Sequence, residues 1–174
     1  MKLQWLILAA ILPFLSCGKE EDFLFNLPFP VLNFTIPAGV NTLESHYFNI
    51  DSVPTNLINV ALAQNFDPGA ISAVRPREAR LQSLFGNVDF DFVFEMTIQL
   101  CEVGDKTPNC GREIFWRQPV PENIGSFIDL IPNENDVKEM LEKDMVNIQV
   151  KLAQLRFTSP TFIEAQLSLD FSVL

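Results

Sequence analysis

One histidine is the side chain of this sequence best suited to acid–base chemistry. His46 is the single histidine among 174 residues. A Ser-His-Asp hydrolase would need it as the general base, but no G-x-S-x-G string accompanies it. His46 instead falls on the apolar phase of an alternating stretch, beside Phe48. We therefore expect a structural histidine in the core or at its rim.

Two aspartates form the next candidate pair. Asp89 and Asp91 stand two positions apart, on one face of an expected strand. Glycoside hydrolases use two carboxyl groups several ångströms apart across a cleft, a separation that such neighbours approach. Alternating acids on a strand mostly keep a wet face soluble, and no Asp-x-Asp-x-Asp-Gly calcium loop is present. The sequence thus predicts a non-enzymatic protein with no catalytic residue, no metal site and no cofactor.

Two cysteines bracket a turn-rich loop. Cys101 and Cys110 flank "EVGDKTPN", which contains Gly-Asp and Thr-Pro turn formers. In an oxidising compartment this arrangement predicts a disulfide across a hairpin. Closing such a ten-residue loop stabilises a fold by about 2.7 kcal/mol in the chain-entropy model. Two free thiols, or a metal or redox pair, are the alternatives, although the spacing is not C-x-x-C.

The amino terminus has the pattern of a secretory signal. Met1 and Lys2 precede an apolar run from Leu3 to Leu15, about thirteen residues long. A membrane-spanning helix needs about 20, so we expect residues 1–16 to be a cleaved signal peptide. An uncleaved anchor or a buried helix of the domain are the alternatives.

The residue that follows this signal is Cys17, in the string "FLSCG". The string resembles a bacterial lipobox, in which cleavage leaves the cysteine first in the mature chain. The resemblance implies that the Cys17 thiol carries diacylglycerol and its amine an acyl chain. Stable anchoring needs at least two chains, so Cys17 would attach the protein to a membrane. A plain secreted protein with a stray thiol is the alternative.

A burst of charge comes directly after Cys17 and Gly18. Lys19, Glu20, Glu21 and Asp22 resemble the export tag of surface lipoproteins of the Bacteroidota. The resemblance implies a lipid-anchored protein on the outer face of the outer membrane. The alternative is a periplasm-facing protein whose charges only form a solvated tether.

The charge balance excludes several kinds of partner. Loss of residues 1–16 would remove Lys2 and leave 11 basic against 22 acidic side chains, a net charge of −11. Nucleic acids and anionic headgroups both require a basic surface. The chain also has sixteen Phe against one Tyr. Because Phe offers no polar group for contacts, we expect these aromatics mainly in the core.

Most of the body alternates with the period of β-strands. The clearest case is 88–100, whose apolar positions include Phe90, Phe92 and Phe94. In 146–157 the apolar phase shifts by one residue after Leu152, which predicts a β-bulge. The same segment is the expected partner of the last strand. The expected strands are 31–36, 44–50, 88–100, 112–117, 126–131, 146–157 and 162–174.

One short helix is expected within 134–144. Asn133 or Asn135 would be its N-cap, and Glu139 and Lys143 would form an i,i+4 pair. Segment 56–64 fits either a helical turn or a strand. Residues 17–30 are expected to be an acidic, Phe- and Pro-containing tether that docks onto the domain.

Together these elements predict a mainly all-β fold. Strands with one wet face stack on their dry faces, so residues 31–174 are expected to form a single antiparallel β-sandwich, immunoglobulin-like in general architecture. Three functions fit: a surface-anchored interaction or accessory module, a carrier of an apolar, lipid-like ligand, or an enzyme. The first is favoured; its protein partner is not identifiable from the sequence.

Overall fold

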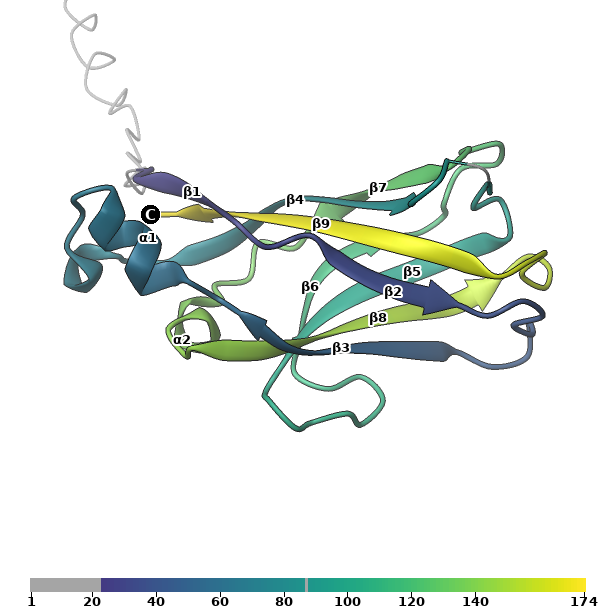
Figure 1. Ribbon diagram of the computed structural model, residues 1–174, viewed down its shortest axis with the longest axis horizontal. Helices are drawn as coiled ribbons and strands as arrows, with labels where there is room; N and C mark the ends of the chain where they lie inside the picture. Colours follow the sequence, from purple (N-terminus) through teal and green to yellow (C-terminus); the bar gives the residue numbers. More distant parts are fainter. Residues whose placement is uncertain (1–22, 87) are drawn as a thin grey trace, which may run out of the picture.

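The computed structural model describes residues 23–86 and 88–174 (Figure 1). The expected signal peptide, Cys17 and the tag Lys19, Glu20, Glu21 and Asp22 lie outside these residues. The described chain contains these elements in order: β1 (Phe25–Pro28), β2 (Leu32–Ile36), β3 (His46–Pro54), α1 (Leu57–Ala63), the 3₁₀ turn η1 (Pro68–Ala70), β4 (Val74–Ser83), β5 (Val93–Cys101), β6 (Arg112–Arg117), β7 (Phe127–Pro132), α2 (Lys138–Leu141), β8 (Met145–Leu155) and β9 (Ile163–Val173).

The strands form one antiparallel path that curls into two layers. Their order is β1-β9-β4-β7-β6-β5-β8-β3, and β2 also pairs with β9 after the break that follows β1. Strand β7 pairs with β4 on one side and with β6 on the other, so it joins the two layers. Figure 1 shows β1, β9 and β4 in one layer and β5, β8 and β3 in the other. The expected antiparallel β-sandwich is confirmed.

The space between the layers is filled by apolar side chains, many of them phenylalanine. The rings of Phe115 on β6 and Phe171 on β9 lie 6.1 Å apart across this space. Phe90, Phe92, Phe115 and Phe171 are each fully buried. Burying one such side chain contributes about 2–3 kcal/mol, so the expectation that the aromatics serve mainly as core is confirmed for these four.

Strand β9 keeps the predicted alternation along its whole length, with every odd position from Ile163 to Val173 buried. Its expected partner is wrong, however. It pairs with β4, β1 and β2, whereas β8 pairs with β5 and β3 in the other layer. The connection 156–162 therefore crosses from one layer to the other, and does not close a hairpin.

The strand expected at 88–100 begins only at Val93. Residues Asp89 to Phe92 belong to the loop before it, although Phe90 and Phe92 still reach the core. Register shifts between Val93 and Met96 interrupt the alternation of the strand. Phe94 is consequently turned out of the core and is only half-buried. At the same irregularity, Ala153 of β8 has no partner residue on β5, which confirms the predicted β-bulge.

The folded domain begins before the expected boundary at residue 31. Phe25–Pro28 is a strand that pairs with β9, and Phe25, Leu27 and Phe29 are buried. The tether expected over 17–30 therefore ends before β1. Pro30 stands in the break between β1 and β2, where a missing backbone donor is tolerated.

The two helices are short. Segment 56–64, which fits a helix or a strand, contains α1. Helix α2 begins at Lys138 after an N-cap at Val137, so the expected Asn caps are wrong. The expected Glu139–Lys143 pair is also replaced, because Lys138 pairs with Glu142 and the Lys143 ammonium lies 2.7 Å from Glu102.

Candidate functional site

Four loops gather at one end of the sandwich. They are 37–45, 84–92, 118–126 and 156–162, and we call them the far-end loops (Asn87 lies outside the described residues). The register places them together: Ile36 lies opposite Ile163, Ser83 opposite Ala165, and Val93 opposite Leu155. The other end holds the start of β1, α1 and the end of β9 (Figure 1).

Arg156 holds three of the far-end loops together. Its guanidinium donates to the carbonyl oxygens of Asp91, at 3.0 Å, and of Val93 and Val120. Its own backbone N–H donates to the carbonyl of Phe92 at 2.8 Å. The cation also lies 5.3 Å from the centre of the Phe94 ring. A charge used in this way is structural, because its N–H groups are taken up by backbone carbonyls of the surrounding loops.

The two candidate carboxylates do not form a pair on a strand face. Asp89 and Asp91 lie in the loop before β5, which corrects their expected placement. The Asp91 carboxylate accepts a hydrogen bond from the backbone N–H of Ile124 at 2.9 Å. It therefore connects loop 84–92 to loop 118–126 and has a structural role like that of Arg156.

Ser159 connects the fourth far-end loop, 37–45, to loop 156–162. Its hydroxyl donates to the carbonyl of Pro37 at 2.7 Å and accepts from the backbone N–H of Val40 at 2.9 Å. His46 stands beside this contact, half-buried, with its Nε2 2.8 Å from the carbonyl of Asn41. His46 therefore lies half-buried at the first residue of β3, and its expected structural role stays a prediction.

The far-end loops expose large apolar side chains. Leu43 is 90% exposed, Phe85 71% and Phe162 57%, each in a different loop. Leu84, Phe157 and, at the start of β7, Phe127 add to them. The apolar phase of 146–157 had assigned Phe157 to the core, so this placement is a correction. The sequence does not reveal this exposed group, because a phenylalanine contributes to the apolar alternation of a segment in the same way whether it is buried or exposed.

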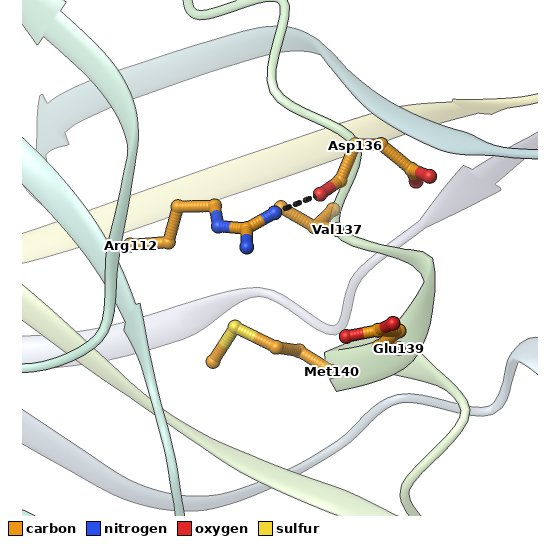
Figure 2. A pocket seen from close by; sticks show the side chains of 5 residues that line it. All are labelled: Arg112, Asp136, Val137, Glu139 and Met140. Carbon is orange, nitrogen blue, oxygen red and sulfur yellow. Dashed lines mark hydrogen bonds between the residues drawn. The ribbon is translucent and has the colours of Figure 1, made fainter.

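Two shallow hollows lie on the surface of the described residues. The first, about 170 Å³, is lined by Arg112, Asp136, Val137, Glu139 and Met140 (Figure 2). Arg112 donates to the Asp136 carbonyl, while the Asp136 carboxylate accepts from the N–H groups of Val74 and Lys138. The second, about 250 Å³, lies beside Asp170. Neither hollow is lined by a histidine or a cysteine.

The predicted cysteine pair is a disulfide at the base of the β5–β6 loop. Cys101 and Cys110 are both buried, with their Cα atoms 5.5 Å apart. The loop folds over the outer face of its sheet, where fully buried Gln149 accepts from the N–H of Asn109 and donates to the carbonyl of Thr107. These contacts give the loop one fixed position.

The described residues contain no group of three His, Cys, Asp or Glu side chains placed to hold a metal ion. Nor does any helix among them have the length and apolar character to cross a membrane.

Comparisons with known proteins add little about function. No protein-family model matches the chain, and no curated protein matches it either. Among solved structures, a chain of cocksfoot mottle virus is similar over 99% of this chain and 95% of its own length, with 12% identity and a TM-score of 0.27. That score is too low to support an argument about this chain.

Proposed function

We propose that the protein is a lipid-anchored lipoprotein of the outer membrane, displayed on the cell surface as a non-catalytic interaction module. Attachment through Cys17 and export through Lys19, Glu20, Glu21 and Asp22 rest on the resemblance of these residues to a lipobox and a surface tag. The proposal gives the protein two contacts: the membrane through its anchor, and a protein partner through the far-end loops.

One observation supports this proposal more than any other: the two ends of the sandwich differ. The chain enters the domain at Phe25, at the end opposite the far-end loops. An anchor before Phe25 would therefore hold those loops away from the membrane. Loops positioned by a rigid scaffold are the usual site of recognition, and exposed apolar side chains are typical of protein interaction sites.

The polar groups that could perform catalysis are engaged elsewhere. The Asp91 carboxylate and the Arg156 guanidinium hold loops, and the His46 ring contacts a carbonyl. An enzyme would need such groups to converge on an open cleft. This arrangement favours a binding module over a hydrolase.

The filled interior favours the module over a carrier of an apolar ligand. A carrier would leave its phenylalanines around an open cavity. Here Phe90 and Phe92 lie 6.2 Å apart, and Phe115 and Phe171 are in edge contact, all fully buried. These rings occupy space between the layers that a carrier would keep open for its ligand.

The proposal is tested by the mass and location of the mature protein. We expect a chain that begins at Cys17 with three acyl groups and sediments with the outer membrane. Cys17→Ser should abolish acylation and release the protein into the soluble fraction. A Leu43→Ser variant, altered at the exposed far end, should remain acylated and membrane-bound.

The contrary results are equally clear. An unmodified mature chain that is soluble without any substitution would refute the anchor. A further lipid that copurifies with the Cys17→Ser protein in native mass spectrometry would instead support the carrier.

A further inference from the structure

The connection from β3 to β4, at the end of the domain nearest the anchor (Figure 1), is mostly apolar and carries little charge. The connection from β3 to β4 includes residues 56–73, which contain a single charged side chain, Asp67. Charged residues make up 20% of the whole chain, so three or four would be expected in 18 residues. The Asp67 carboxylate accepts a hydrogen bond from the backbone N–H of Gly69 at 3.0 Å and thereby caps the start of η1.

Helix α1 exposes apolar side chains on one face of this connection. Leu57 and Ala61 are buried against the core, whereas Ile58 and Leu62 are 39% and 57% exposed. Ile58 and Leu62 are four positions apart and share a helix face. The core of the domain therefore buries one apolar face of α1, and the second apolar face, with Ile58 and Leu62, stays exposed.

This helix lies beside the point where the chain enters the domain. The ring of Phe66, just after α1, stacks on the ring of Phe25 at 5.5 Å. Phe23, 58% exposed, comes two residues before Phe25. Six peptide units separate Cys17 from Phe23, which span at most about 20 Å when fully extended.

We propose that the exposed face of α1, with Ile58, Leu62 and Phe23, rests in the interfacial region of the membrane to which Cys17 is anchored. The inference rests on the proposed lipid anchor and adds a second, direct contact between the domain and lipid. The partner is a zwitterionic or neutral lipid interface. The protein as a whole is acidic and is repelled by anionic headgroups, and the exposed face of α1 offers no basic side chain to attract them.

The tether explains why so small an apolar surface is sufficient. Three exposed side chains are too few to hold a soluble protein on a bilayer. A short tether, however, keeps the second contact at an effective concentration in the millimolar range, so a weak contact is populated. The domain would then stand on its α1 end, with the far-end loops directed away from the bilayer.

A fluorescent depth probe tests this contact. Bimane is attached to Ala63→Cys, an exposed position beside Leu62, in the full mature chain reconstituted into phosphatidylcholine vesicles. Because Cys101 and Cys110 are joined and Cys17 is acylated, the new thiol is the one available. The matched control carries the same label at Leu43→Cys in a far-end loop. Brominated acyl chains should quench the Ala63→Cys label at least threefold more than the control.

A second variant separates the contact from the anchor. Ile58→Glu with Leu62→Glu, both at exposed positions, should reduce quenching of the Ala63→Cys label to the level of the control while the protein still floats with the vesicles. Equal quenching of the two labels in an acylated, floating chain would overturn the α1 contact alone. A mature chain without acyl groups would overturn both the contact and the proposed function.

A third readout identifies a different cover for α1. Protection of the Ala63→Cys label from an aqueous quencher, without quenching by brominated lipid, would mean that protein, such as a second copy of the chain, covers the helix. That result would also overturn the proposal.

Discussion

The guanidinium of Arg156 donates a hydrogen bond to the backbone carbonyl of Asp91 at 3.0 Å, across 65 positions of sequence. The Asp91 carboxylate in turn accepts from Ile124 at 2.9 Å. Loops 84–92, 118–126 and 156–162 are therefore held by a single network of charge-assisted hydrogen bonds. This network makes the far end a fixed surface, and it engages Asp91, one of the two aspartates that first suggest chemistry.

Removing this guanidinium should destabilise the fold. Arg156→Met keeps most of the side-chain length but leaves the carbonyls of Asp91, Val93 and Val120 without their donor. We expect a loss of about 3 kcal/mol in the free energy of unfolding, measured by urea denaturation. Arg80→Met, which removes an exposed pair with Asp129, should lower the free energy of unfolding far less. Equal losses would contradict the network.

The β5–β6 loop offers a matched pair of glycines. Both Gly104 and Gly111 have positive φ, at 89° and 60°. A Cβ at Gly111 would clash with the backbone of Leu100 and Cys101, whereas one at Gly104 meets nothing within 4 Å. Gly111→Ala should therefore lower the free energy of unfolding by about 3 kcal/mol or more, and Gly104→Ala by about 1 kcal/mol. Thermal melts of the two variants would reveal the difference, and similar values would mean that the loop can shift.

The disulfide should contribute stability beyond the contacts of its loop. Cys101→Ala together with Cys110→Ala opens a ten-residue ring, and we expect a loss of about 2–3 kcal/mol in urea. Reductant should give the same loss in the unsubstituted protein and no further loss in the variant. If the unsubstituted protein were insensitive to reductant and free thiols could be titrated, the cysteines would not be joined.

Asp170 gives the stability a pH dependence of known sign. Burial raises the pKa of its carboxyl, and Arg77, 3.6 Å away, opposes this only in part. Because the pKa is higher in the folded state, folding is favoured most when Asp170 is protonated, and this stability is lost as the pH rises through the folded pKa.

Asp170→Asn should consequently be more stable than the unsubstituted protein at pH 7, by less than about 1 kcal/mol because the group is only partly buried. The gain should disappear below the ordinary pKa of 3.8. Asp129→Asn, at an exposed ion pair, should bring no gain at pH 7. Unfolding measured from pH 3 to pH 8 tests both, and a destabilised Asp170→Asn protein at neutral pH would contradict the sign.

The sequence predicts an element well where one face is continuously apolar. Strand β9 alternates without interruption from Ile163 to Val173, and its extent was predicted to within one residue at each end. Strand β4 was not recognised, although it lies at the centre of its layer. Its inward positions include Pro76, Ala79 and Ser83, and a register shift between Pro76 and Glu78 breaks the period of two. Small or polar inward residues and a bulge together hide a strand.

Pairing could not be predicted from neighbouring positions alone. Strands β8 and β9 follow one another across a seven-residue connection, which fits a hairpin as well as a crossing between layers. In the structure, Ser159 joins that connection to Pro37 and Val40. That contact joins residues more than 100 positions apart, and no local pattern reports it.

The far-end surface was equally hidden. Phe157 and Phe162 have the same residue type as the buried Phe171, and only the fold determines which of them reaches the core. The proposed anchor is the opposite case: it rests on Cys17 and the charges after it in the sequence, and these residues lie outside the described ones.

Protease treatment of intact cells, followed by immunoblotting, tests the central claim most directly. The account predicts that external protease digests the protein while a periplasmic control survives, and that replacing Lys19, Glu20, Glu21 and Asp22 with alanine protects it without loss of acylation. If the unsubstituted protein survives in intact cells and is digested only after lysis, it faces the periplasm, and surface display is contradicted.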